Sequence, residues 1–150
     1  MEDYAGAFEA RCQDVTSLLV DPQRTIGAAH LGGVAIECQL KALMIKYHDI
    51  EAWGDLGGRP KDPMRSQPIE RPGHGLISML RLMHFLHAKA RSDVLFLRHL
   101  ARINNPSGPT NNDFIDLRYS AGDLPAGAAA DWHLSYKYVI GWLKKNGEVV

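Results

Sequence analysis

The chain has 150 residues, of which 45% are hydrophobic and 23% are charged. This length and apolar content are typical of one domain with one core, and they exclude a disordered chain. Seventeen basic and seventeen acidic side chains leave no net charge when histidine is neutral. The composition therefore shows no overall attraction to nucleic acid or to an anionic membrane, although it leaves room for a local basic patch.

We expect a cytoplasmic protein without a membrane partner. No apolar run approaches the roughly 20 residues that a membrane-spanning helix needs. The acidic beginning, MEDYAGAFEA, lacks the basic and apolar regions of a signal peptide. Cys12 and Cys38 lie on separate helical segments without a paired spacing, so we expect two reduced thiols in or near the core.

Two helices are predicted at the start of the chain. Apolar residues recur at helical spacing over residues 4–20, and Asp21-Pro22 ends this segment because the residue before proline leaves the α region. Residues 25–48 form the longest stretch without proline and are apolar on most of their circumference. They predict a central helix, with Thr25 as its N-cap, that packs on the first helix as an antiparallel hairpin.

The remaining residues predict further helices and two long loops. Glycine and proline recur over residues 49–73, and a second irregular stretch covers about 105–127. Helices are expected over residues 74–90, over residues 93–104 with Ser92 as the cap, and over about 128–145. The inward-facing residues of the last two helices are expected to be Val94, Leu95, Leu97, Leu100, Trp132, Tyr136, Val139, Ile140 and Leu143. The expected fold is all-α, a four- to five-helix up-and-down bundle in a single domain over residues 1–150.

One narrow stripe of the central helix combines small, charged and histidine side chains. At about 100° per residue, the stripe carries His30, Gly33, Glu37, Lys41, Met44 and His48. Glycine inside a helix costs about 1 kcal/mol relative to alanine, so Gly32-Gly33 predicts that a neighbouring backbone approaches there. Glu37 and Lys41 allow three interpretations: a surface salt bridge, a ligand site, or a buried ion-pair network that Arg118 completes when the last helix covers the stripe.

Three segments of the chain carry a resemblance to a known family. AAHLGGVAIECQLKALM has a small-residue half followed by Glu37, Leu40, Lys41 and Ala42, GHGLISML at residues 73–80 has a histidine before an amphipathic helix, and FIDLRYS at residues 114–120 ends in Arg-Tyr-Ser. Together, and in this order over residues 4–145, they resemble the HEPN family, the small all-helical prokaryotic domains that often accompany nucleotidyltransferases.

The usual ribonuclease motif of that family does not fit this sequence. Catalytic HEPN domains resemble metal-independent ribonucleases, with an Arg and a His four to six residues apart at the start of the last helix. Here no histidine follows Arg118 until His133. Arg81 and His87 have the spacing but fall within an expected continuous helix, where about 240° of rotation points them apart. The resemblance thus implies a non-catalytic or weakly catalytic module, with Arg81, His87 and Arg118 as weak catalytic candidates.

The ligand-binding candidates are chosen for phosphate and base recognition. Arg118 can contact a phosphate bidentately and Tyr119 can stack on a base, while Asp116 can hold Arg118 in place. The alternative is that Arg118 pairs with Glu37 and that Tyr119 packs in the core. His74, at a helix start, can meet an anion or tether the loop. The full candidate set is Glu37, Lys41, His74, Asp116, Arg118 and Tyr119.

No cofactor, metal or duplex DNA is expected. The sequence contains no HExxH, CxxC, Walker or Gly-x-Ser-x-Gly pattern, and its histidine pairs are isolated. The resemblance implies a homodimer with a nucleotide or RNA ligand, or with a nucleotidyltransferase partner in a toxin–antitoxin context. The alternatives are a metal-independent ribonuclease toxin and a purely structural scaffold subunit.

Overall fold

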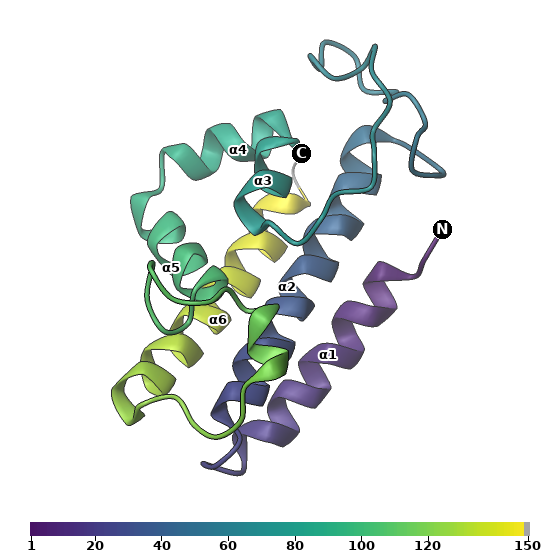
Figure 1. The fold of residues 1–150 in the computed structure, drawn as a ribbon. Coiled ribbons are helices and arrows are strands. Elements are labelled where there is room, and N and C mark those ends of the chain that lie inside the picture. Colours follow the sequence, from purple (N-terminus) through teal and green to yellow (C-terminus); the bar gives the residue numbers. More distant parts are fainter. Residues whose placement is uncertain (149–150) are drawn as a thin grey trace.

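The computed structural model describes residues 1–148, which form six α-helices and one short 3-10 helix (Figure 1). α2 (Thr25–His48) runs through the middle of the bundle, with α1 (Tyr4–Leu19) along one side. The other side is covered by α3 (Leu76–Arg81), α4 (His84–Arg91), α5 (Val94–Asn104) and α6 (Ala126–Gly147), while η1 (Asp116–Tyr119) packs on α2 from the second long loop. The predicted all-α bundle is confirmed.

The central helix has the predicted bounds but not the predicted cap. Arg24 occupies the N-cap position without a capping side chain. Thr25 instead accepts a hydrogen bond from the backbone N–H of Leu124 through its hydroxyl, at 2.7 Å. The threonine therefore fixes the second long loop to the start of α2. At the other end, Asp49 adopts the left-handed conformation (φ 54°) and its N–H donates to the carbonyl of Ile45.

Aromatic side chains, not a neighbouring backbone, approach the paired glycines of α2. A Cβ on Gly32 would overlap the indole ring of Trp132, and a Cβ on Gly33 would overlap the ring of Phe114. Trp132 and Phe114 are both almost completely buried. The expectation of a close backbone was therefore wrong, although the cause of the two glycines is still a close contact.

The helix expected over residues 74–90 is broken at Leu82 and Met83, between α3 and α4. Nothing in the local sequence marks this break, because the end of α2 makes it. His48 Nε2 lies 2.8 Å from the carbonyl oxygen of Leu82, and the hydroxyl of Tyr47 accepts a hydrogen bond from the N–H of Phe85 at 3.1 Å. These two side chains satisfy backbone groups that a continuous helix would have paired internally.

The last two helices differ from their predictions at their ends. α5 is capped by Asp93, whose carboxylate accepts the N–H of Phe96, and not by Ser92. Val94 and Leu95 are 62% and 51% exposed, so their expected inward position was wrong. The buried side of α5 is instead Phe96, Leu100 and Ile103. In α6 the predicted inward residues are buried except Ile140, which is half-buried.

The first long loop, between α2 and α3, is anchored to the helices at several points. Ile69 is almost fully buried, its N–H donates to the carbonyl of Asp55, and its own carbonyl accepts from Gly54. Arg59 donates to the carbonyl of Tyr47 at 3.2 Å, and its guanidinium lies 4.2 Å from that ring. The loop extends beyond the end of α2 and then returns along it to reach α3 (Figure 1).

The structure also bears on the expected state of the two cysteines and on the expected lack of a membrane-spanning helix. Cys12 and Cys38 are free thiols, half-buried and buried respectively, as predicted. No helix within residues 1–148 combines the length and apolar character needed to cross a membrane.

Candidate functional site

A buried cluster of charged and polar side chains lies on the stripe of α2 that the sequence singles out. Glu37 and Lys41 are one helical turn apart, and Lys41 Nζ lies 2.6 Å from Glu37 Oε1. The other carboxylate oxygen, Oε2, lies 2.9 Å from Nδ1 of His74, which arrives from the end of the first long loop. Each oxygen of Glu37 therefore has one nitrogen partner, so both oxygens are hydrogen-bonded by these two side chains.

The two halves of the cluster differ sharply in exposure. The side chains of Glu37 and Lys41 are only 8% and 5% exposed, whereas that of His74 is 57% exposed. The ring of Tyr4 covers Lys41, with the ammonium 5.6 Å from the ring centroid. A buried ion pair of this kind is satisfied mainly by its own partners. The surface-salt-bridge interpretation is therefore wrong, and the imidazole of His74 is the part of the cluster that a ligand can reach.

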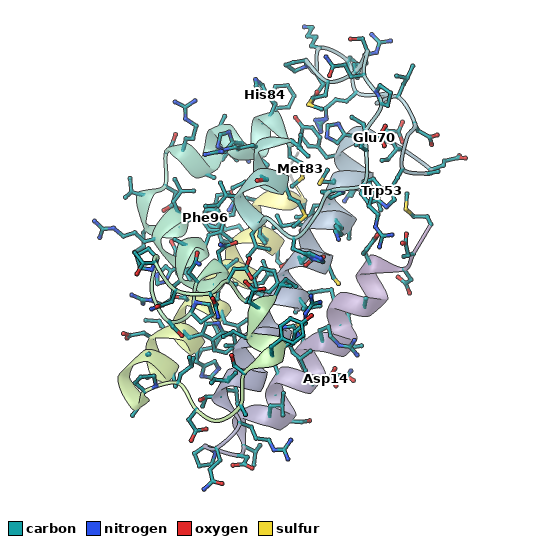
Figure 2. The ribbon with its side chains drawn as sticks, viewed as in Figure 1. Asp14, Trp53, Glu70, Met83, His84 and Phe96 are labelled. Atoms are coloured by element: carbon teal, nitrogen blue, oxygen red, sulfur yellow. The ribbon has the colours of Figure 1, made fainter. Side chains whose placement is uncertain are left out.

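Tyr4 is a member of this cluster that sequence analysis missed. Its apolar spacing on α1 marked it only as a core position. In the structure its hydroxyl accepts a hydrogen bond from the indole of Trp53 (labelled in Figure 2) at 3.3 Å, so the first loop, α1 and Lys41 meet at the Tyr4 ring. No local signal distinguishes such a tyrosine, because its partners come from other elements.

The cysteine beside the cluster is not set up as a nucleophile. Burial raises the pKa of Cys38, and the neighbouring Glu37 carboxylate raises the pKa further, against smaller opposing effects of Lys41 and Arg11. A thiol with a raised pKa is mostly protonated near neutral pH and is unreactive. Cys38 therefore packs against the core.

Arg118 does not meet Glu37, and the prediction that it completes the buried network was wrong. His74 takes the carboxylate oxygen that Arg118 was expected to contact. In η1 the buried position is Leu117, so its neighbour Arg118 points to solvent. Within residues 1–148, no carboxylate lies within 4 Å of the Arg118 guanidinium.

Arg118 instead stacks on its neighbour. Its guanidinium carbon lies 4.7 Å from the ring centroid of Tyr119, which is 78% exposed. The alternative that Tyr119 packs in the core is thereby excluded. Asp116 is also exposed and makes no ion pair with Arg118. The result is an uncompensated positive charge beside an accessible aromatic ring.

Segments from the two long loops, and not the last helix, cover the part of the α2 stripe from His30 to Glu37. His30 Nδ1 lies 2.7 Å from the carbonyl oxygen of Phe114, whose ring packs on Gly33. One turn further along α2, about 6 Å away, Glu37 binds His74. Phe114, four residues before Arg118, and His74 therefore contact the same face of α2 about one turn apart.

The weak catalytic candidates have a different geometry from the one expected. Arg81 ends α3 and His87 lies in α4, so the argument from rotation along one continuous helix does not apply. Burial lowers the pKa of His87, and the positive charges of Arg91, Arg81 and His84 lower it further. His133 lies on α6, where burial and then Lys137 lower its pKa. Neither histidine neighbours Arg118 in the sequence.

The described residues contain no group of three or more His, Cys, Asp or Glu side chains placed to hold a metal ion. Comparison with known protein families, with curated proteins and with solved structures finds no match to this chain.

Proposed function

We propose that this chain is a non-catalytic, HEPN-like helical module that binds a nucleotide-type ligand at the surface formed by His74, Arg118 and Tyr119. The observation that carries the proposal is the exposed Arg118–Tyr119 stack, which has no carboxylate partner among the described residues. A guanidinium binds phosphate oxygens bidentately, and an exposed aromatic ring offers a face to a base. Glu37 and Lys41 hold the His74 ring at the edge of this surface and do not contact the ligand.

The test is thermal stabilisation by AMP, ADP, ATP and inorganic phosphate. A ligand present at ten times its Kd stabilises the folded state by about 1.4 kcal/mol, which raises Tm by about 3–6 °C for a chain of this size. Arg118→Ala should leave the Tm of the free protein unchanged, because the side chain is exposed, but should abolish the shift. Arg65→Ala, which removes an exposed arginine of the first loop, is the matched control and should keep the shift.

Two results contradict the proposal. One is a full nucleotide-induced shift in Arg118→Ala, which would place the ligand elsewhere. The other is a large loss of stability in Arg118→Ala without any ligand effect in the parent protein, which would support a purely structural role.

From the resemblance to the HEPN family we also propose that the chain forms a homodimer and that it binds a nucleotidyltransferase partner. Sedimentation equilibrium of the whole chain, alone and mixed with a minimal nucleotidyltransferase, tests both. A monomer at all concentrations removes the first, and a lack of co-sedimentation removes the second for that partner.

A metal-independent ribonuclease is the second candidate, favoured by the break between α3 and α4. The break removes the geometric objection to Arg81 and His87, and the lowered pKa of His87 keeps its imidazole neutral near pH 7, as a general base requires. Cleavage of RNA in the presence of EDTA should then be lost in His87→Ala and kept in His133→Ala. Equal cleavage by the parent and by His87→Ala would exclude this histidine.

A further inference from the structure

The neutral chain distributes its charges unevenly over the fold. Residues 76–104, which span α3 to α5, contain five basic residues and one acidic residue, and residues 132–147 of α6 contain three basic residues and no acidic one. The basic residues are Arg81, Lys89, Arg91, Arg98, Arg102, Lys137, Lys144 and Lys145. All other acidic residues of the chain lie outside these two segments. α6 also carries Asp131, before the second segment, so the basic part of the bundle is α4, α5 and the later turns of α6.

The single acidic residue of these segments is already occupied. One carboxylate oxygen of Asp93 accepts the N–H of Phe96 as the cap of α5, at 3.0 Å. The other oxygen accepts the indole N–H of Trp142 on α6, at 2.9 Å. Within residues 1–148 none of the eight basic side chains has a carboxylate within 4 Å. Lys144 lies over the ring of Phe8 on α1, with its ammonium 5.6 Å from the ring centroid, so it belongs to another face. The charges of the other seven are available to an external anion.

An open groove of about 500 Å³ lies on this basic side, between the start of α5 and the second half of α6. Lys137 and Lys145 line it together with the rings of Tyr138 and Trp142, and the carboxylate of Asp93 lies at its α5 wall, where it holds the Trp142 indole. Along α6, Lys137 and Lys145 are about 12 Å apart at the rise of an α-helix. The groove thus combines two cations and two aromatic rings along α6 with a single hydrogen-bonded carboxylate on the α5 side.

Both rings are held in place by partners beneath them. Trp142 stacks on Phe96 (labelled in Figure 2), with ring centroids 3.8 Å apart and an angle of 16° between the planes. Tyr138 lies 4.3 Å from the ring of His99, which is itself fixed by a 2.8 Å contact from Nδ1 to the hydroxyl of Ser135. Arg102 lies close enough to His99 to lower the pKa of that imidazole, after the larger effect of burial. Rings fixed in this way can accept a stacked base without first becoming ordered.

We propose that the groove between α5 and α6 binds single-stranded nucleic acid, with Lys137, Lys145 and the exposed arginines of α5 on the phosphates and with Tyr138 and Trp142 against the bases. Cationic grooves interleaved with aromatic rings are the usual platform for single strands, because every unpaired base has a face to stack. A duplex keeps its bases stacked internally and cannot use the rings. An acidic peptide could use the lysines, but it offers no flat groups for Tyr138 and Trp142.

This inference does not depend on the nucleotide site at Arg118. That site lies on η1 and on the face of α2 covered by the two loops, whereas the groove lies between α5 and α6. Arg118→Ala should therefore leave oligonucleotide binding intact, and substitutions in the groove should leave the response to mononucleotides intact. The two proposals fail independently.

The test is fluorescence anisotropy of labelled 12-nucleotide poly(U) RNA and poly(dT) DNA. A labelled 12-base-pair duplex is measured in the same way as the alternative ligand. Four phosphate contacts, from Lys137, Lys145, Arg98 and Arg102, give a salt dependence of about −3 in log K against log salt. Affinity should then fall about 50-fold between 50 and 200 mM salt. Binding of either single strand supports the proposal, and the comparison between them shows whether a 2′-hydroxyl is recognised.

Charge reversal in the groove is compared with the same change elsewhere. Lys137→Glu with Lys145→Glu should weaken single-strand binding at least tenfold, while Lys46→Glu with Lys61→Glu, at exposed positions outside the groove, should change it less than threefold. Circular dichroism melts verify that both double variants fold.

Three results overturn the inference: no anisotropy change at 50 mM salt with micromolar protein, duplex binding as tight as single-strand binding, or displacement by poly-glutamate as effective as displacement by unlabelled oligonucleotide. An equal loss in the two double variants overturns it as well, because the effect would then be one of net charge alone.

Discussion

Replacing Glu37 by glutamine leaves the Lys41 ammonium buried without a compensating negative charge. The two side chains are 8% and 5% exposed and their charged atoms lie 2.6 Å apart, so water cannot replace the lost partner. Breaking a buried pair by removing one member costs about 3–5 kcal/mol. Each kcal/mol lowers Tm by about 2–4 °C in a chain of this size, so we expect Glu37→Gln to melt about 6–20 °C below the parent protein.

Two further variants show whether this cost comes from the uncompensated charge. His74→Ala removes only the half-exposed partner of Glu37, so its cost should stay below about 1 kcal/mol, as for other exposed pairs. Glu37→Leu combined with Lys41→Met removes both charges and keeps the volume, and it should recover most of the stability. Urea denaturation of the four proteins gives the free energies. A cost below about 1 kcal/mol for Glu37→Gln, or a double variant no more stable than Glu37→Gln, would refute the reasoning.

Three other predictions test the packing, the capping and the pH response. Gly33→Ala should destabilise the fold by about 1–3 kcal/mol because its Cβ would overlap Phe114. Gly141→Ala, at a position of α6 with open space around it, should stabilise the fold by about 0.5–1 kcal/mol. Urea denaturation compares the two variants, and a change of the same sign in their free energies of unfolding contradicts the account. Asp93→Ala should lower the free energy of unfolding by about 1–2 kcal/mol, because α5 loses its N-cap. It should also shift the fluorescence emission of Trp142, whose indole loses its hydrogen bond, and an unchanged emission spectrum argues against that bond. Burial holds the pKa of His48 below 6.5, so below that pH the unfolded chain binds a proton at His48 more readily than the folded chain does. The free energy of unfolding should therefore be highest above pH 6.5 and should fall as the pH drops below it. His48→Gln should make Tm depend less on pH between 5 and 7, and an identical pH profile in the two proteins excludes His48 as a source.

The local parts of the fold were predictable from sequence. Pro22 and the apolar periodicity around it define where α1 ends and where α2 begins, and both signals lie within a few residues of the structure that they specify. The break at Leu82 was not predictable, because its cause is His48 and Tyr47, which meet that segment only after the chain has folded back. Side chains that replace backbone partners from a distance leave no periodic or compositional trace.

The polar cluster shows the same limit. Glu37 and Lys41 were paired from their spacing on one helix face, which depends only on helix geometry. The third partner was assigned to Arg118, but it is His74, because the path of a 27-residue connection decides which side chain arrives at Glu37. A single short turn determines which residues of η1 face inward, and in that turn Leu117 is buried while the neighbouring Arg118 is exposed.

The contact between Glu37 and His74 joins residues that are 37 positions apart, whereas α1 and α2 are joined by a short turn. Contacts that close long stretches of chain form after local ones, since their entropic cost is met only once the nearby helices are in place. The helical hairpin should accordingly belong to the folding nucleus, and the return of the loop to α2 should follow the rate-limiting barrier. Substitutions of His74 should then accelerate unfolding in stopped-flow experiments while leaving the refolding rate almost unchanged, so this contact sets how long the native state persists and has little effect on how fast it is reached.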